Sequence, residues 1–178
     1  KKYPVCVVKP LKSVTFYPRI VGRDQQLQNI MQSLKSINRG APEKNVFLVK
    51  GITGTGKTRF IKEAAYFLSL ENVSIYPNYD LKKTSGENIW KNILIKLLSN
   101  FSYDKSMSGY LRNSLHNHKE IRSLFFEYSK TNPCFIIIDD IHLADDTNLD
   151  LLLYLALEVV YVGKIGLIFS YNETTNPK

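Results

Sequence analysis

One stretch, VFLVKGITGTGKT at residues 46–58, constrains the fold more than any other part of the chain. It begins as a short apolar run, passes through three glycines, and enters a helical pattern at Lys57. Residues 51–58 match G-x-x-x-x-G-K-[ST] at every fixed position, between a strand-like and a helix-like segment as that motif requires. The sequence therefore predicts a strand, a phosphate-binding loop and a helix in immediate succession. The alternative is a glycine-rich turn that binds nothing.

Each part of the predicted loop has a physical reason. Glycines lack a Cβ atom, so the main chain can approach a phosphate closely and adopt positive φ angles. The N–H groups of residues 54–58 are then expected to point at an anion, and the helix start adds its positive end. Lys57 is expected to contact the β and γ phosphates, and the Thr58 hydroxyl to bind Mg²⁺. The expected nucleotide contacts in this stretch are Gly51, Thr53, Gly54, Thr55, Gly56, Lys57, Thr58 and Arg59. A dinucleotide fingerprint is disfavoured, because Arg59 and Phe60 follow where it needs a small residue.

A second apolar run, Phe135 to Ile138, ends in two acids. A buried strand there would place Asp139 beside the phosphates, where it would hold Mg²⁺, in part through water. Asp140 would orient the attacking water or take its proton, although a helix-cap role is the alternative for such an acid. His142 follows, and it either lies near the site or caps the next helix.

Strand-like and helix-like segments alternate along the chain. Because the strands are continuous apolar runs, they predict an α/β fold of three layers, with a parallel sheet covered on both faces. Thr84 with Glu87, and Thr147 with Asp150, are predicted to cap helices. The expected strands are 46–50, 73–77, 135–138 and 164–170, and the expected helices are 24–37, 57–70, 84–98, 110–130 and 147–162.

Three stretches together resemble a known family. RIVGRDQQLQNI (19–30) resembles the hydrophobic-Gly-Arg-acid signature of AAA+ and related STAND signalling ATPases, and GITGTGKTRFIKE resembles their phosphate-binding loop. FIIIDDIHLADDTNLDLLLYLAL (135–157) is similar to the acidic strand and helix in the ATPase regions of large class III adenylyl cyclases. Two positions depart from the pattern, since Asp24 replaces the usual Glu and Leu143 the frequent Trp.

The resemblance implies further features of this chain. In such ATPases the strand order is 5-1-4-3-2, and a polar residue at the end of the fourth strand senses the γ-phosphate. Asn172, or alternatively Ser170, occupies that place. Val21, Gly22 and Arg23 are implied to lie near the nucleotide base, although Arg23 is open to a salt bridge at the helix start instead. The fifth strand, helical lid and arginine finger of the family are not recognisable before Lys178.

Composition limits the setting of this domain. The formal net charge of +8 allows a nucleic-acid partner, but no dense Lys/Arg run favours one. The two cysteines, Cys6 and Cys134, show no metal-ligand spacing and indicate a reducing, cytoplasmic compartment. No run of apolar residues is long enough to cross a membrane. Residues 1–18 are expected to be a lead-in from a preceding domain, and residues 19–178 a nucleotide-binding domain truncated before its lid.

Together these features predict a domain that binds ATP or ADP with Mg²⁺. It would be a regulatory ATPase or switch module in a larger signalling protein, such as an adenylyl cyclase, with neighbouring domains of the same polypeptide as partners. Hydrolysis would be slow, by attack of water on the γ-phosphate, with Lys57, Asp140 and Asn172 as the catalytic residues. The alternatives are an AAA+ initiator or loader of DNA replication, which would be nuclear, a small-molecule kinase, and a binding-only module. The absence of the guanine-reading motif N-K-x-D favours ATP over GTP.

Overall fold

The structure is a computed structural model. It describes residues 20–39, 45–71, 73–78, 133–162 and 164–173, together with Ile93 and Ser123. The predicted lead-in at 1–18 lies outside the described residues, as do the predicted helices at 84–98 and 110–130 apart from Ile93 and Ser123.

Four parallel strands form the sheet. They are β1 (Val46–Gly51), β2 (Ser74–Asn78), β3 (Cys134–Ile138) and β4 (Ile165–Asn172), in the order β1-β4-β3-β2. The fourth strand therefore lies between the first and the third, which confirms the 1-4-3-2 part of the predicted order. Among the described residues no fifth strand pairs with β1.

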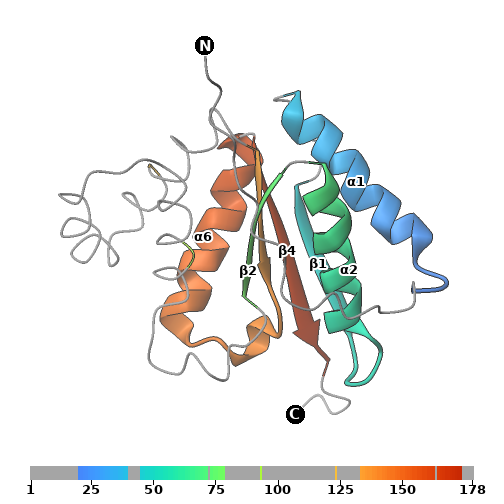
Figure 1. Cartoon of the computed structure of the whole chain (residues 1–178). Helices are drawn as coiled ribbons and strands as arrows, with labels where there is room; N and C mark the ends of the chain where they lie inside the picture. Colours follow the sequence, from blue (N-terminus) through green and yellow to red (C-terminus); the bar gives the residue numbers. More distant parts are fainter. Residues whose placement is uncertain are drawn as a thin grey trace, which may run out of the picture.

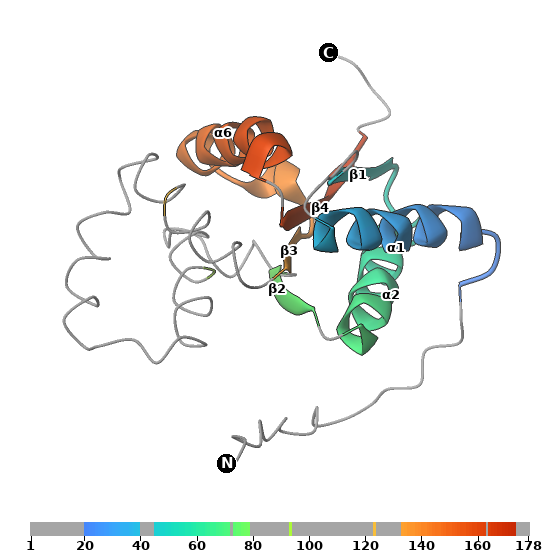
Figure 2. The same ribbon diagram turned by 90° about the horizontal axis from the view of Figure 1, so that it is seen from above.

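Helices cover both faces of the sheet, so the predicted three-layer α/β fold is confirmed. In Figures 1 and 2, α1 (Asp24–Asn38) and α2 (Lys57–Leu70) lie on one side, and α6 (Asp146–Val162) lies on the other. Side chains of β3 alternate between the two cores: Phe135 and Ile137 pack with α1 and α2, whereas Ile136 and Ile138 pack with α6. No helix of the described residues is long and apolar enough to cross a membrane.

The predicted cap of α6 is wrong. The helix begins at Asp146, so Thr147 lies inside its first turn. Asp145 supplies the cap instead, because its Oδ1 accepts the main-chain N–H of Asn148 at 2.8 Å. Asp, like Thr, is a good N-cap residue, and the sequence places three such side chains in a row at this helix start.

Gly166 in β4 leaves room for the ring of Phe135. The two residues are paired in the parallel register, and a Cβ atom on Gly166 would lie 2.2 Å from Phe135 Cε1. We expect Gly166→Ala to destabilise the fold by about 1–3 kcal/mol, because overpacking forces neighbouring groups to move. Urea unfolding measures the effect. Phe135→Leu should recover part of the loss in the double variant, and simple additivity of the two single losses would contradict the steric explanation.

Cys134 is fully buried at the start of β3. Burial raises the pKa of its thiol to about 12, because the thiolate cannot be solvated there. Thiol reagents attack the thiolate, so we expect Cys134 to resist alkylation at pH 8 in the folded protein and to react at the ordinary rate in urea. The measurement uses a Cys6→Ser background, so that a single thiol is followed. Rapid alkylation without denaturant would show that β3 is not packed as described.

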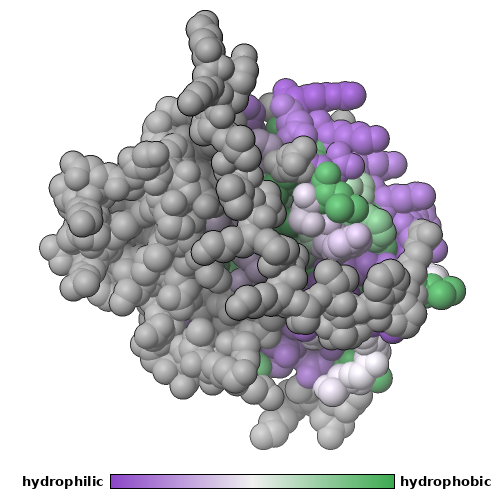
Figure 3. Space-filling model, viewed as in Figure 1, coloured by the Kyte–Doolittle hydropathy of each residue, from purple (hydrophilic) through white to green (hydrophobic). Residues whose placement is uncertain are grey.

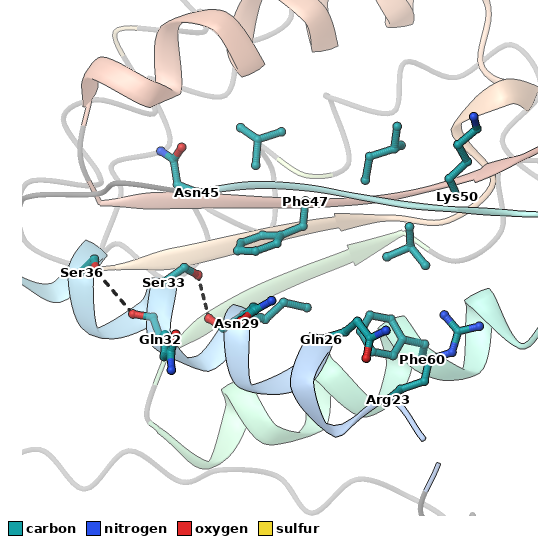
Figure 4. Close-up of a pocket in the computed structure, with 14 residues that line it drawn as sticks. Arg23, Gln26, Asn29, Gln32, Ser33, Ser36, Asn45, Phe47, Lys50 and Phe60 are labelled. Atoms are coloured by element: carbon teal, nitrogen blue, oxygen red, sulfur yellow. Dashed lines mark hydrogen bonds between the residues drawn. The ribbon is translucent and has the colours of Figure 1, made fainter. Parts of the chain in front are cut away.

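A groove of about 890 Å³ runs along the open edge of β1. Figure 4 shows it between β1 and α1, with Phe47 pointing from the strand toward the helix and Lys50 pointing to the opposite side. The α1 side of the groove is polar, with Gln26, Asn29 and Gln32 among its lining residues. The outer surface of α1 is also hydrophilic where it is visible in Figure 3. Lys57 and Asp139 do not line this groove, so it is separate from the predicted phosphate site.

Candidate nucleotide site

The loop between β1 and α2 has the backbone that the glycine motif requires. Gly54 and Gly56 have φ angles of 87° and 82°, in the left-handed region that side chains with a Cβ atom rarely adopt. Thr55 closes the turn, because its N–H and its hydroxyl both donate to the Ile52 carbonyl, at 3.4 and 2.8 Å. The loop is therefore folded back on itself by its own hydrogen bonds.

Some main-chain N–H groups of this loop have no acceptor within the described part of the chain. No acceptor in the described part of the chain pairs with the N–H of Gly54 or Gly56. Lys57 and Thr58 belong to the first turn of α2, whose N–H groups have no carbonyl partner within the helix. A group of main-chain donors at a helix start is suited to bind an anion.

The Lys57 side chain lies inside this arrangement and is only 7% exposed. Its Nζ donates to the Ile52 carbonyl at 2.9 Å and to Asn172 Oδ1 at 3.0 Å. Asn172 also donates through Nδ2 to Thr53 Oγ1 at 2.8 Å. Asn172 therefore links Lys57 to the loop. It lies within reach of the loop because Asn172 and Gly51 are partners in the β1–β4 register.

The acid that follows β3 is buried and held in place. Asp139 is 2% exposed, and its Oδ1 accepts hydrogen bonds from the Ser170 hydroxyl and from the Asp140 N–H, the latter at 3.1 Å. The Asp140 N–H also donates to Ser170 Oγ at 2.8 Å. Of the two candidate γ-phosphate sensors, Ser170 therefore lies against Asp139, and Asn172 contacts Lys57. The sequence did not predict the Ser170–Asp139 contact, although an aligned parallel register of β3 and β4 would have suggested it.

Asp140 turns the chain sharply out of β3. It is the one non-glycine residue in the described chain with a positive φ, at 51°. Asp tolerates this conformation better than most residues, and such backbone angles are frequent at functional sites. Its side chain makes no capping hydrogen bond to the short helix η2 (Ile141–Leu143) that follows. Its carboxylate lies 4.0 Å from His142 Nδ1. His142 therefore lies near the candidate site, which is one of its two predicted positions.

The segment before α1 contacts the loop from outside. Arg23 Nη2 donates to the Thr55 carbonyl at 3.2 Å, and the guanidinium carbon lies 5.8 Å from the Phe60 ring centre. The Ile20 N–H donates to the Glu63 carboxylate, with distances of 3.0 and 3.3 Å to its two oxygens. Gly22 has a φ of 84°, and Val21 is 92% exposed. Thr58 and Arg59 are also exposed.

A model of the AAA ATPase domain matches residues 19–160, which is most of the chain. The chain belongs to this AAA ATPase family. No curated protein matches it in sequence.

Solved structures share the fold of this AAA ATPase domain. Cdc6p from Pyrobaculum aerophilum superposes with a TM-score of 0.59 at 18% identity, covering 90% of this chain and 42% of that one. The ORC2 protein of Aeropyrum pernix, solved as ADPNP and ADP complexes, gives 0.56 at 15% identity, covering 90% and 44%. This chain therefore spans less than half the length of either structure. Identities this low show a shared fold only.

Proposed function

We propose that this domain binds ATP with Mg²⁺ and hydrolyses it slowly, as a switch within a larger protein. One observation carries the proposal: the buried Lys57 ammonium lies within a loop whose main-chain N–H groups are left for an anion. Among the described residues Lys57 has neutral acceptors and no acidic partner, and a buried cation of this kind is unfavourable unless an anion binds beside it. A triphosphate supplies that polyanion.

The residues available for a metal ion fit Mg²⁺. In the described residues no group of three or more His, Cys, Asp or Glu side chains is placed to hold a metal ion by itself. Mg²⁺ usually takes one or two protein oxygens and fills its remaining positions with phosphate and water. Thr58 would supply a hydroxyl. Asp139 would supply Oδ2, since Oδ1 is already bonded to Ser170 and Asp140. When bound, the metal would neutralise charge on the phosphates.

The remaining residues take the following parts in the proposed reaction. Lys57 and the loop N–H groups stabilise the negative charge that develops on the γ-phosphate. Asp140 orients the attacking water and accepts its proton. Asn172, which already contacts Lys57, senses whether a γ-phosphate is present. Val21, Gly22 and Arg23 lie beside the base, with Arg23 fixed to the loop by its bond to Thr55.

Two settings are proposed for the switch. Cdc6p and ORC2 have the same fold and lead us to favour a replication initiator or loader, with DNA as a partner. The second candidate is a signalling module of the kind attached to class III adenylyl cyclases, which the stretch at 135–157 favours. In either setting we propose an intracellular location, as the free thiol of Cys134 suggests. In either setting, too, a fifth strand would pair with the edge of β1 that is open among the described residues.

Calorimetric titration with ATP, ADP and GTP, each with and without Mg²⁺, tests the proposal. We expect ATP and ADP to bind, ATP more tightly with Mg²⁺, and GTP to bind more weakly. Absence of heat with nucleotide at about 1 mM, which limits the binding free energy to about −4 kcal/mol, would refute a nucleotide-binding role. Transfer of phosphate to an added small molecule instead of water would indicate a kinase.

Duplex DNA binding distinguishes the two settings. A protein that contacts 6–10 phosphates loses about 10³- to 10⁵-fold in affinity between roughly 50 and 200 mM salt. A steep salt dependence of that kind is expected for the initiator or loader. Weak binding that is insensitive to salt would favour the signalling module.

A further inference from the structure

His142 contacts the end of β4 from the turn that follows β3. Its Nδ1 accepts the main-chain N–H of Asn172 at 3.3 Å. Its ring also lies edge-on to the Tyr171 ring, with 5.8 Å between centres. One side chain of η2 therefore contacts two consecutive residues of the strand that carries the proposed γ-phosphate sensor.

The hydrogen bond replaces one that the sheet cannot supply. Leu167 and Glu173 donate their N–H groups to β1, at the carbonyls of Asn45 and Gly51. Since successive N–H groups of a strand point to opposite sides, the even-numbered residues of β4 donate toward β3. The β3–β4 pairing ends at Ile138 with Phe169. The Asn172 N–H therefore extends past the end of β3, and His142 provides the acceptor.

The position of Asn172 depends on this bond. On the β1 side, the next residue, Glu173, is fixed by its 3.1 Å bond to Gly51. On the β3 side, His142 fixes the Asn172 main chain, while the Asn172 side chain spans Lys57 and Thr53. The interaction needs an unprotonated Nδ1, so the neutral ring carries its proton on Nε2. Among the described residues, the Asp140 carboxylate lies 4.0 Å from Nδ1.

We propose that His142 is a positioning residue. As a neutral hydrogen-bond acceptor, it holds the end of β4 so that Asn172 distinguishes a triphosphate from a diphosphate. This inference rests on the proposed function, because it concerns the same nucleotide site. It adds that the discrimination depends on a residue outside the phosphate-binding loop, the Asp139–Asp140 pair and the sensor itself.

Three substitutions separate the hydrogen bond from the bulk of the ring. In His142→Asn the side-chain Oδ1 can take the place of Nδ1 as acceptor, whereas His142→Gln places its polar atoms nearer to Nε2 and His142→Leu has none. The readout is the ratio of the dissociation constants of Mg·ADP and a non-hydrolysable Mg·ATP analogue, which needs no turnover. Thermal melting of each variant confirms that it is folded.

We expect His142→Leu to reduce that ratio about 5-fold or more, which corresponds to one lost hydrogen bond of about 1 kcal/mol. The affinity for ADP should stay close to that of the wild type, and His142→Asn should recover most of the ratio. Asn172→Ala should lower the ratio as well, and combining it with His142→Leu should add little, because both remove one interaction.

The inference would be overturned if His142→Leu discriminated like the wild type, if His142→Asn were no better than His142→Leu, or if the two losses were additive. It would also fall if the wild type bound both nucleotides equally well. Failure of the wild type to bind either nucleotide is a different result, and it would refute the proposed function itself.

Discussion

Lys57→Ala is expected to lower the affinity for Mg·ATP by at least about 100-fold. The side chain is 7% exposed and supplies the positive charge at the loop, where it contacts Ile52 and Asn172. Hydrogen bonds to charged groups contribute about 1.5–3 kcal/mol each, so losing those to the phosphates readily exceeds the 2.7 kcal/mol or so that a 100-fold change represents. Calorimetry at fixed Mg²⁺ measures the change.

Two further variants make the Lys57 result specific. Lys57→Met keeps most of the buried aliphatic chain, so an equal loss of affinity in Lys57→Met and Lys57→Ala would assign the effect to the charge. Lys35→Ala removes an exposed lysine from the last turn of α1 and should bind ATP like the wild type. Wild-type affinity in folded Lys57→Ala would mean that the phosphates do not lie at this loop.

Asp140→Asn is expected to retain nucleotide binding and to reduce turnover by about 10²- to 10⁴-fold, the usual contribution of a general base. Asp140 holds a φ of 51°, and Asn accepts the left-handed region about as readily as Asp. The substitution therefore keeps the turn out of β3 and removes only the charge. Single-turnover hydrolysis of ATP, together with ATP affinity, separates the two effects.

Asp146→Asn is the matched control for Asp140→Asn. Asp146 is an exposed acid at the start of α6, so its loss should leave the turnover of wild type unchanged. An unchanged hydrolysis rate in Asp140→Asn would exclude Asp140 from the mechanism. Another group near the end of β3 would then have to accept the proton of the attacking water. A parallel loss of ATP affinity would indicate a role in binding instead.

Local sequence pattern was sufficient for most of the secondary structure that the structure describes. The apolar face of Leu27, Ile30, Leu34 and Ile37 predicts α1, and these residues are buried. The helix after the loop was predicted with its bounds, Lys57 to Leu70. Helix starts were less certain, because Asp145, Asp146 and Thr147 are all good caps and only the folded chain shows that Asp145 contacts Asn148.

The sequence by itself determined the phosphate-binding loop, the acid at the end of β3 and the α/β class. Each depends on residues that are neighbours in the chain, where the spacing of glycines or apolar side chains is enough to predict backbone geometry. The sequence offered Asn172, or alternatively Ser170, as the residue that senses the γ-phosphate, but it could not show which of the two lies beside Lys57. It also could not assign His142 to either of its two expected positions.

Only the tertiary structure decided those points. Asn172 meets Lys57 across 115 positions of the chain, and Ser170 meets Asp139 across 31. Both contacts exist because β4 lies between β1 and β3 and extends past the last paired residue of β3. Strand order and register are long-range properties, set by how the whole sheet buries its two faces, and no local periodicity specifies which side chains then meet at its edge.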